Sequence, residues 1–173
     1  WSYARYGYPI AAGLSLTLVM SSTDRFLLEV FQGPAAVGAY HAGYSLASRT
    51  LDVLFIWLGA AGTPALIMAW ERSNREGFMA AAREQASTFI LIALPAAVGL
   101  ALVAKPLSDV MIGEDLRAAA AAVTPLIAIS ALLSGVTSYY LSQSFVLGRR
   151  TDRLLLTLCI PAASNVMLNL ALV

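Results

Sequence analysis

The sequence predicts an all-α fold, a polytopic bundle of transmembrane helices with about five spans, and its composition and patterning carry that prediction. Apolar residues make up 59% of the 173 residues and charged residues 12%, whereas a soluble domain has about 45–50% apolar and about 25% charged residues. The mean hydropathy of +0.74 reflects long apolar stretches separated by short polar ones. No stretch of useful length alternates polar and apolar residues, as a half-buried strand would.

The spans follow from the length of the apolar stretches. A helix needs about 20 predominantly apolar residues to cross about 30 Å of hydrocarbon. Gln32-Gly33-Pro34 ends the first stretch, because glycine and proline together favour a turn. The second is longer than the bilayer requires, so we expect it to tilt or to extend into the interface. Polar loops are expected at residues 71–77, 105–115 and 148–153. The predicted spans are residues 6–31, 35–70, 83–104, 118–147 and 154–173.

Each predicted span contains a proline. Proline removes a backbone donor and kinks the helix that carries it. Membrane helices tolerate proline in general, but one in every span favours helices that bow around an internal cavity. Residues 59–64 combine small residues with Pro64 and are the best candidate for a hinge. The five prolines are Pro9, Pro64, Pro95, Pro125 and Pro161.

The basic residues predict how the spans are oriented. Arginines cluster before the first span, after the second and after the fourth, whereas the other two connections hold Lys105 and Arg117 beside three acids. Because cytoplasmic loops carry an excess of lysine and arginine, the arginine-bearing segments are expected in the cytoplasm. Those arginines are Arg5, Arg72, Arg75, Arg83, Arg149, Arg150 and Arg153.

The composition also argues against several classes of function. Cys159 is the single cysteine and His41 the single histidine, so no disulfide, no metal site of cysteines and histidines and no nucleophile–base pair is expected. No glycine-rich phosphate loop is present. We therefore expect no enzymatic activity, no cofactor and no metal, and a net charge of +1 gives no reason to expect a nucleic acid. Because the chain begins and ends in apolar stretches, we expect residues 1–173 to be a partial transmembrane domain.

Charged residues within the predicted spans are the first candidates for function, because an unpaired charge is costly in hydrocarbon. Arg25 and Arg49 are placed to hold an anionic headgroup in a water-filled cavity, since a guanidinium stays charged and its planar fork of donors matches phosphate. Alternatively, Arg25 with Glu29 and Arg49 with Asp52 form structural ion pairs, or Arg25 extends to the interface.

Polar residues recur at helical spacing in four of the predicted spans. His41, Ser45, Ser48 and Asp52 follow one another at steps of four, three and four, which places them on one helical face. Such faces either line a hydrated lumen or hydrogen-bond helix to helix, and stripes on four spans favour the lumen. The other stripes are Ser15, Ser22, Arg25 and Glu29; Ser130, Ser134 and Ser138; and Asn165 with Asn169.

Several short motifs carry a resemblance to a known family. They are Tyr6-Gly7-Tyr8-Pro9, Ser22-Thr23-Asp24-Arg25-Phe26-Leu27-Leu28, Val37-Gly38-Ala39-Tyr40-His41-Ala42-Gly43-Tyr44-Ser45-Leu46, Gly148-Arg149-Arg150-Thr151 and the Asn165–Asn169 pair. In their order and spacing the chain resembles the polysaccharide-export and O-antigen (lipid-linked oligosaccharide) flippases of the multidrug/oligosaccharidyl-lipid/polysaccharide exporter superfamily.

The resemblance implies a two-lobed transporter of which this chain is most of the C-terminal lobe. It implies a polyprenyl-pyrophosphate-linked oligosaccharide or polysaccharide precursor as substrate, moved across a bacterial inner membrane. Membrane lipids and the remaining helices of the full-length chain would be the other partners. Asp24 and Arg25 match the family's aspartate–arginine motif, and Arg49 would join them in a cationic cavity. The alternatives are a cation- or proton-coupled multidrug efflux carrier and a non-transporting scaffold of a glycan-assembly complex.

Overall fold

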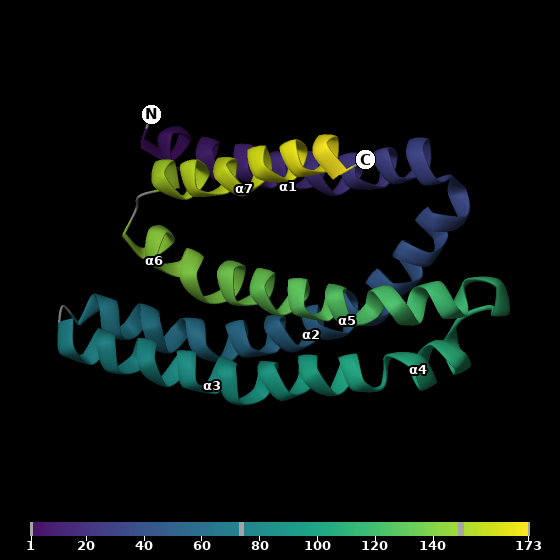
Figure 1. Ribbon diagram of the computed structural model, residues 1–173. Coiled ribbons are helices and arrows are strands. Elements are labelled where there is room, and N and C mark those ends of the chain that lie inside the picture. Colours follow the sequence, from purple (N-terminus) through teal and green to yellow (C-terminus); the bar gives the residue numbers. More distant parts are fainter. Residues whose placement is uncertain (1, 73–74, 149–150, 173) are drawn as a thin grey trace. The chain divides into compact units, whose positions relative to one another are not determined.

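The computed structural model describes residues 2–72, 75–148 and 151–172, which are helical almost throughout and contain no strand (Figure 1). The all-α prediction is therefore confirmed. The elements are α1 (Ser2–Gln32), α2 (Pro34–Glu71), α3 (Arg75–Leu102), α4 (Ala104–Met111), α5 (Glu114–Val136), the π-helical turn η1 (Thr137–Leu141), α6 (Ser142–Leu147) and α7 (Thr151–Leu172). The predicted prolines lie inside α1, α2, α3, α5 and α7.

Three helices in the described part of the chain are long and apolar enough to cross a membrane. They are Pro34–Glu71, Arg75–Leu102 and Glu114–Leu147, which match the second, third and fourth predicted spans. The first and fifth predicted spans correspond to α1 and α7, and their role as membrane spans stays a prediction. The break between the first two helices lies where the sequence placed it, because α1 ends at Gln32 and Gly33 adopts a φ of 84°. Glycine takes this left-handed conformation without a steric penalty.

The connection after the third span differs from the prediction. The sequence analysis expected a loop at residues 105–115, but Ala104–Met111 forms the helix α4. Pro106 does not prevent it because a proline in the first turn of a helix needs no hydrogen-bond partner there. Ala104 and Ser108 lie four residues apart and both are buried, so one face of α4 packs on the rest of the unit while Lys105 and Asp109 stay exposed.

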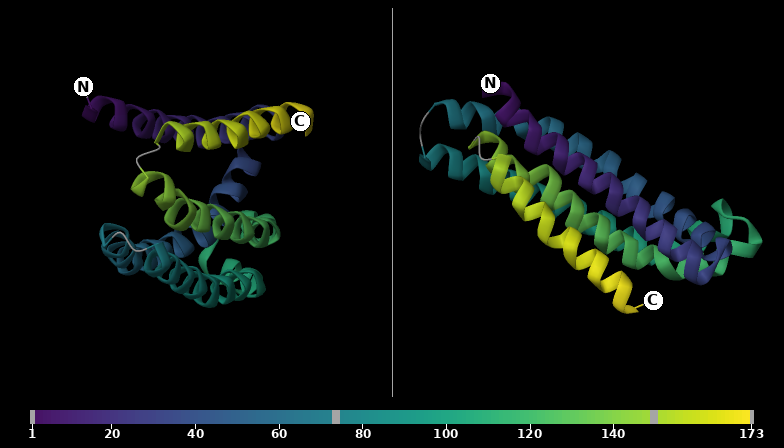
Figure 2. Two further views of the ribbon diagram at one scale, coloured as in Figure 1. Left: turned by 90° about the vertical axis from the view of Figure 1, so that its left-hand side faces the viewer. Right: turned by 90° about the horizontal axis from the view of Figure 1, so that it is seen from above.

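The chain divides into two compact units. The terminal unit comprises Trp1–Val37 and Ser144–Val173, and the central unit comprises Gly38–Gln143. In the terminal unit α1 and α7 lie side by side and run in the same direction (Figures 1 and 2). Gly13 brings the pair close, since a Cβ added there would lie 3.0 Å from Cδ1 of Leu158.

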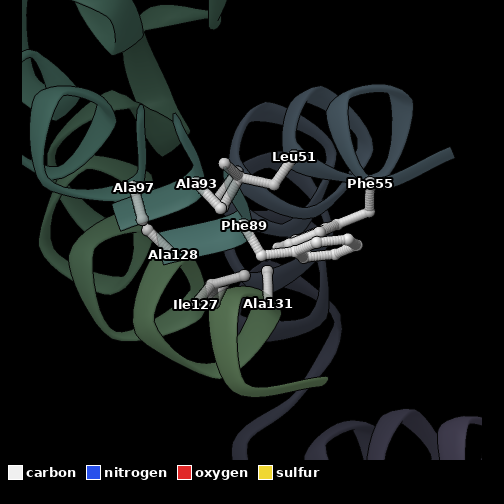
Figure 3. Close-up of a cluster of buried hydrophobic side chains, with 9 residues drawn as sticks. Leu51, Phe55, Phe89, Ala93, Ala97, Ile127, Ala128 and Ala131 are labelled. Carbon is white, nitrogen blue, oxygen red and sulfur yellow. The ribbon is translucent and has the colours of Figure 1, made fainter. Parts of the chain in front are cut away.

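In the central unit α2, α3 and α5 run in alternating directions, so that each is antiparallel to the one before it (Figure 1). Small residues line the contact between α3 and α5. They are Ala93 and Ala97 of α3 and Ala128 and Ala131 of α5, which all belong to the buried cluster (Figure 3). Lipid tails are as apolar as leucine, so helices in a membrane gain little by hiding apolar side chains from lipid and associate instead by close packing. Small side chains allow that close approach.

The aromatic residues of the central unit complete its core. The ring of Phe55 on α2 is fully buried and stacks on Phe89 of α3, with centroids 6.0 Å apart (Figure 3). Phe55 also stacks on Tyr139 of η1 at 6.1 Å. Gly135 makes room for Phe55, because a Cβ there would fall within contact distance of the ring. These three rings connect α2, α3 and η1.

Candidate functional site

The candidate site on α2 follows from which side of that helix is packed. The packed residues include Ala39, Gly43, Ala47, Leu51 and Phe55, each four positions after the last. Four residues turn a helix by about 40° beyond one full turn, so the packed side winds gradually around α2. The residues left outside it include both charged residues of the middle of the helix and the histidine near its start.

Arg49 is the central candidate, and its side chain is exposed. It lies 15 residues after Pro34 in a helix of 38 residues and within the second predicted span, where a charge that lacks water or a counter-charge is costly. Among the described residues, no ion pair joins Arg49 to Asp52. The predicted alternative of a structural pair between these two residues is therefore not formed in this conformation.

The polar stripe on α2 is divided by the packing. His41 and Asp52 are exposed and Ser45 is half-buried, whereas Ser48 is only 6% exposed. Because the packed side winds around the helix, it reaches Ser48 next to Leu51 while leaving Asp52 outside. The four residues thus share a helical face but do not share one environment. That His41, Ser45 and Asp52 line a hydrated path stays a prediction.

The other candidates lie in the terminal unit. Asp24 and Arg25 are half-buried on α1, and both take part in interactions. The hydroxyls just before them bond within the helix, since Ser22 Oγ donates to the Leu18 carbonyl at 2.9 Å and Thr23 Oγ1 to the Val19 carbonyl at 2.8 Å. Such bonds satisfy these hydroxyls where no water is present.

On α7, Asn165 is half-buried, and the side chain of Asn169 lies outside the described residues. Arg149 and Arg150, two of the arginines that set the predicted orientation, also lie outside them. Ser130 and Ser134 of α5 and Ser138 of η1 are all exposed, and that they line a hydrated lumen stays a prediction.

A buried polar residue that the sequence did not indicate lies inside the central unit. Gln85 on α3 is 7% exposed, and in the described part of the chain neither atom of its amide has a hydrogen-bond partner. A lone glutamine at the polar end of an apolar stretch looks like an ordinary border residue. Its significance becomes visible only when Gly62 of α2 is seen packed against its amide.

No group of three or more histidine, cysteine, aspartate or glutamate residues within the described ranges is arranged to hold a metal ion. Cys159 is a free, exposed cysteine. The exposed side chains of α2 offer a guanidinium at Arg49, an imidazole at His41 and a carboxylate at Asp52, which suit binding of charged and polar groups by ionic hydrogen bonds.

Comparison with known proteins decides the family. A family described as polysaccharide biosynthesis protein matches residues 2–121. The chain belongs to this family. The matched region contains α1 to α4 and the first residues of α5, so it includes Arg25 and Arg49, while Asn165 and Asn169 lie beyond it. No curated protein and no solved structure matches the chain. Together with the three apolar helices, the match makes this a membrane protein with a role related to polysaccharide synthesis.

Proposed function

We propose that this chain is part of a flippase that moves a polyprenyl-pyrophosphate-linked oligosaccharide or polysaccharide precursor across a bacterial inner membrane. In this proposal the protein is not an enzyme. It binds the pyrophosphate, lets the glycan cross between helices and releases it unchanged. Its partners are the lipid-linked glycan, the surrounding lipids and the remaining helices of the full-length protein.

The observation that supports this proposal most is the position of Arg49. It is 15 residues after Pro34 and 22 before Glu71, or about 22 Å and about 33 Å along the axis at 1.5 Å per residue. Its exposed guanidinium cannot reach the ends of α2, because an arginine side chain is much shorter than either distance. In this proposal the membrane-spanning part of α2 includes Arg49, and an arginine there is tolerated only beside water, a counter-charge or the headgroup of a bound lipid. A pyrophosphate supplies both charge and acceptors for the guanidinium fork.

Polysaccharide biosynthesis provides a substrate with that chemistry. Precursors of cell-surface glycans that are carried on a polyprenyl pyrophosphate combine an apolar tail, an anionic linker and a hydrophilic glycan. Arg49 is assigned to the linker, while His41, Ser45 and Asp52 of the same helix are assigned to the glycan or to water. A multidrug carrier would favour acids that bind cations, and a scaffold would have no use for an exposed arginine within a predicted span.

The test compares Arg49, within α2, with Arg72, which directly follows α2. Arg49→Lys keeps the charge but loses the fork, whereas Arg72→Lys makes the same change at an exposed position just after α2. The full-length protein is reconstituted into proteoliposomes with a fluorescent polyprenyl-pyrophosphate glycan, and flipping is measured by access of an impermeant quencher. We expect Arg49→Lys to slow flipping at least tenfold and Arg72→Lys to leave it unchanged.

Two outcomes would contradict the proposal. Flipping at the wild-type rate by the Arg49→Lys protein would remove Arg49 from the substrate site. A loss of folded Arg49→Lys protein from the membrane, with normal flipping by what remains, would assign Arg49 a structural role instead. Failure of the wild-type protein to flip any pyrophosphate-linked glycan would contradict the function itself.

A further inference from the structure

The side-chain amide of Gln85 is closely packed and has no hydrogen-bond partner among the described residues. Its amide is buried against Gly62 of α2, and a Cβ added at Gly62 would lie 2.5 Å from Nε2 of Gln85. Both Oε1 and Nε2 lack hydrogen-bond partners within the described residues. A buried amide without a partner is unfavourable, so a conformation that gave Gln85 a partner would be stabilised relative to this one.

A hydroxyl that could become this partner lies on the same side of α3. The hydroxyl of Tyr140 donates to the carbonyl oxygen of Ala82 at 3.0 Å, while its ring lies 6.3 Å from that of Phe89. Ala82, Gln85 and Phe89 are three and four residues apart and therefore share one face of α3. The side chain of Tyr140 thus contacts α3 at the Ala82 carbonyl and at the Phe89 ring, on the side of α3 that carries Gln85.

The backbone that carries Tyr140 is irregular. Tyr140 belongs to η1, a turn of π-helix between α5 and α6. Single π-helical turns within α-helices are rare and occur frequently at functional sites. Here the wide turn is closed by Ser142, whose hydroxyl donates to the Thr137 carbonyl at 2.9 Å. The neighbouring Tyr139 is fixed by its stacking on Phe55 and by Gly59, whose added Cβ would lie 2.9 Å from the Tyr139 ring.

We propose that Tyr140 is a two-position latch, whose hydroxyl exchanges between the carbonyl of Ala82 and the side-chain oxygen of Gln85, with η1 as the joint that permits the shift. One hydrogen bond breaks and one forms. The Ala82 carbonyl retains its helical donor four residues later, and the Gln85 oxygen gains a donor that it lacks in the conformation described. The position of the Tyr140 hydroxyl relative to α3 therefore differs between the two states.

The latch rests on contacts inside the central unit and not on the proposed transport function. It does, however, place a conformational joint beside Gly59 of α2, in the segment of residues 59–64 that is the predicted hinge candidate. Tyr139 remains anchored while Tyr140 moves, so the two adjacent tyrosines should behave differently. That difference supplies a matched control.

The experiment observes the hydroxyl directly and needs no substrate. Full-length protein containing tyrosine labelled with ¹³C at the ζ carbon is placed in lipid nanodiscs and examined by solid-state NMR. The ζ carbon lies on the ring axis, so ring flips do not affect it, whereas its shift responds to the hydrogen bond of the attached oxygen. The signals of Tyr139 and Tyr140 are assigned by Tyr139→Phe and Tyr140→Phe. We expect two signals, or one signal broadened by exchange, for Tyr140 and one sharp signal for Tyr139.

Gln85→Met, which keeps the length of the side chain and removes its oxygen, should leave a single sharp Tyr140 signal and an unchanged Tyr139 signal. The unchanged Tyr139 signal also shows that the aromatic core is intact, and Gln85→Leu repeats the test if the methionine variant disturbs it. A single sharp Tyr140 signal in the wild type would overturn the proposal. So would two Tyr140 signals that persist when the oxygen of residue 85 is removed.

Discussion

Replacing Gly135 by alanine tests the packing of the central unit, and Gly99→Ala provides the control. Both glycines lie within long helices of the unit, but a Cβ at Gly99 would meet nothing within 4 Å, whereas a Cβ at Gly135 would overlap the ring of Phe55. In each case alanine gains about 0.5–1 kcal/mol of helix propensity over glycine. This gain cancels when the two variants are compared, so their difference measures the overlap alone.

The overlap should be costly because no space is left into which the Phe55 ring could move. Its ring is 0% exposed and is held between Phe89 and Tyr139. Overpacking of a filled core costs about 1–3 kcal/mol, and an immobile ring puts the expected cost in the upper half of that range. Gly99→Ala should therefore be neutral or stabilising, and Gly135→Ala should be less stable than Gly99→Ala by about 2–3 kcal/mol.

The assay is reversible unfolding in mixed micelles, followed by tryptophan fluorescence. Phe55→Leu combined with Gly135→Ala should recover part of the loss, because the smaller side chain removes the overlap, so the two changes should not be additive. Equal stability of the Gly99→Ala and Gly135→Ala proteins would refute this account of the core. Additive effects of Phe55→Leu and Gly135→Ala would show that the two positions do not touch.

Two further predictions concern topology and the break between the first helices. In a Cys159→Ser background, cysteines at Asn74 and Gly113 should react with an impermeant thiol reagent from opposite sides of the membrane, and labelling of both from one side would disprove the predicted orientation. Gly33→Ala should destabilise the protein by about 1–2 kcal/mol in the same unfolding assay, because residue 33 has a φ of 84°. Gly7→Ala in α1, where a Cβ would meet nothing within 4 Å, should not.

The features that the sequence predicted well depend on local chemistry. Gly33 followed by Pro34 stops α1 and starts α2 because one residue favours a left-handed backbone and the other lacks a donor. The apolar stretches became helices because a continuous apolar segment within a membrane must satisfy its own backbone hydrogen bonds. Such signals need no knowledge of neighbouring helices.

The features that the sequence did not predict depend on packing between residues far apart in the chain. Residues 105–115 look polar enough for a loop, but Ala104 and Ser108 pack on the unit and make α4 a helix. Ser48 belongs to a regular polar stripe, yet the winding of the packed side along α2 buries it. Nothing in the run from Thr137 to Leu141 indicates a π-helical turn. The contacts of Tyr140 with α3 that accompany it join residues more than 50 positions apart.

The burial of Ser48 changes what the polar stripe predicts about water. A hydrated face at steps of four, three and four would have made all four residues accessible. The structure instead predicts that access is lost at Ser48 and reduced at Ser45, while His41 and Asp52 remain accessible. Protection at Ser48 would indicate a path bordered by the packed side of α2. Access at all four positions would indicate a stripe that faces a wide aqueous cavity.

A cysteine scan along α2 tests most directly whether its exposed polar side lines a water-filled path. Single cysteines replace His41, Arg49, Asp52, Ser48 and Leu51 in a Cys159→Ser background, and their reaction with a small hydrophilic thiol reagent is measured in membranes. Positions 41, 49 and 52 should react quickly, because only a hydrated thiol forms the reactive thiolate, and the buried positions 48 and 51 should be protected. Protection of all five positions would contradict the account, since the polar side of α2 would then face lipid or dry protein and Arg49 would have no path to serve.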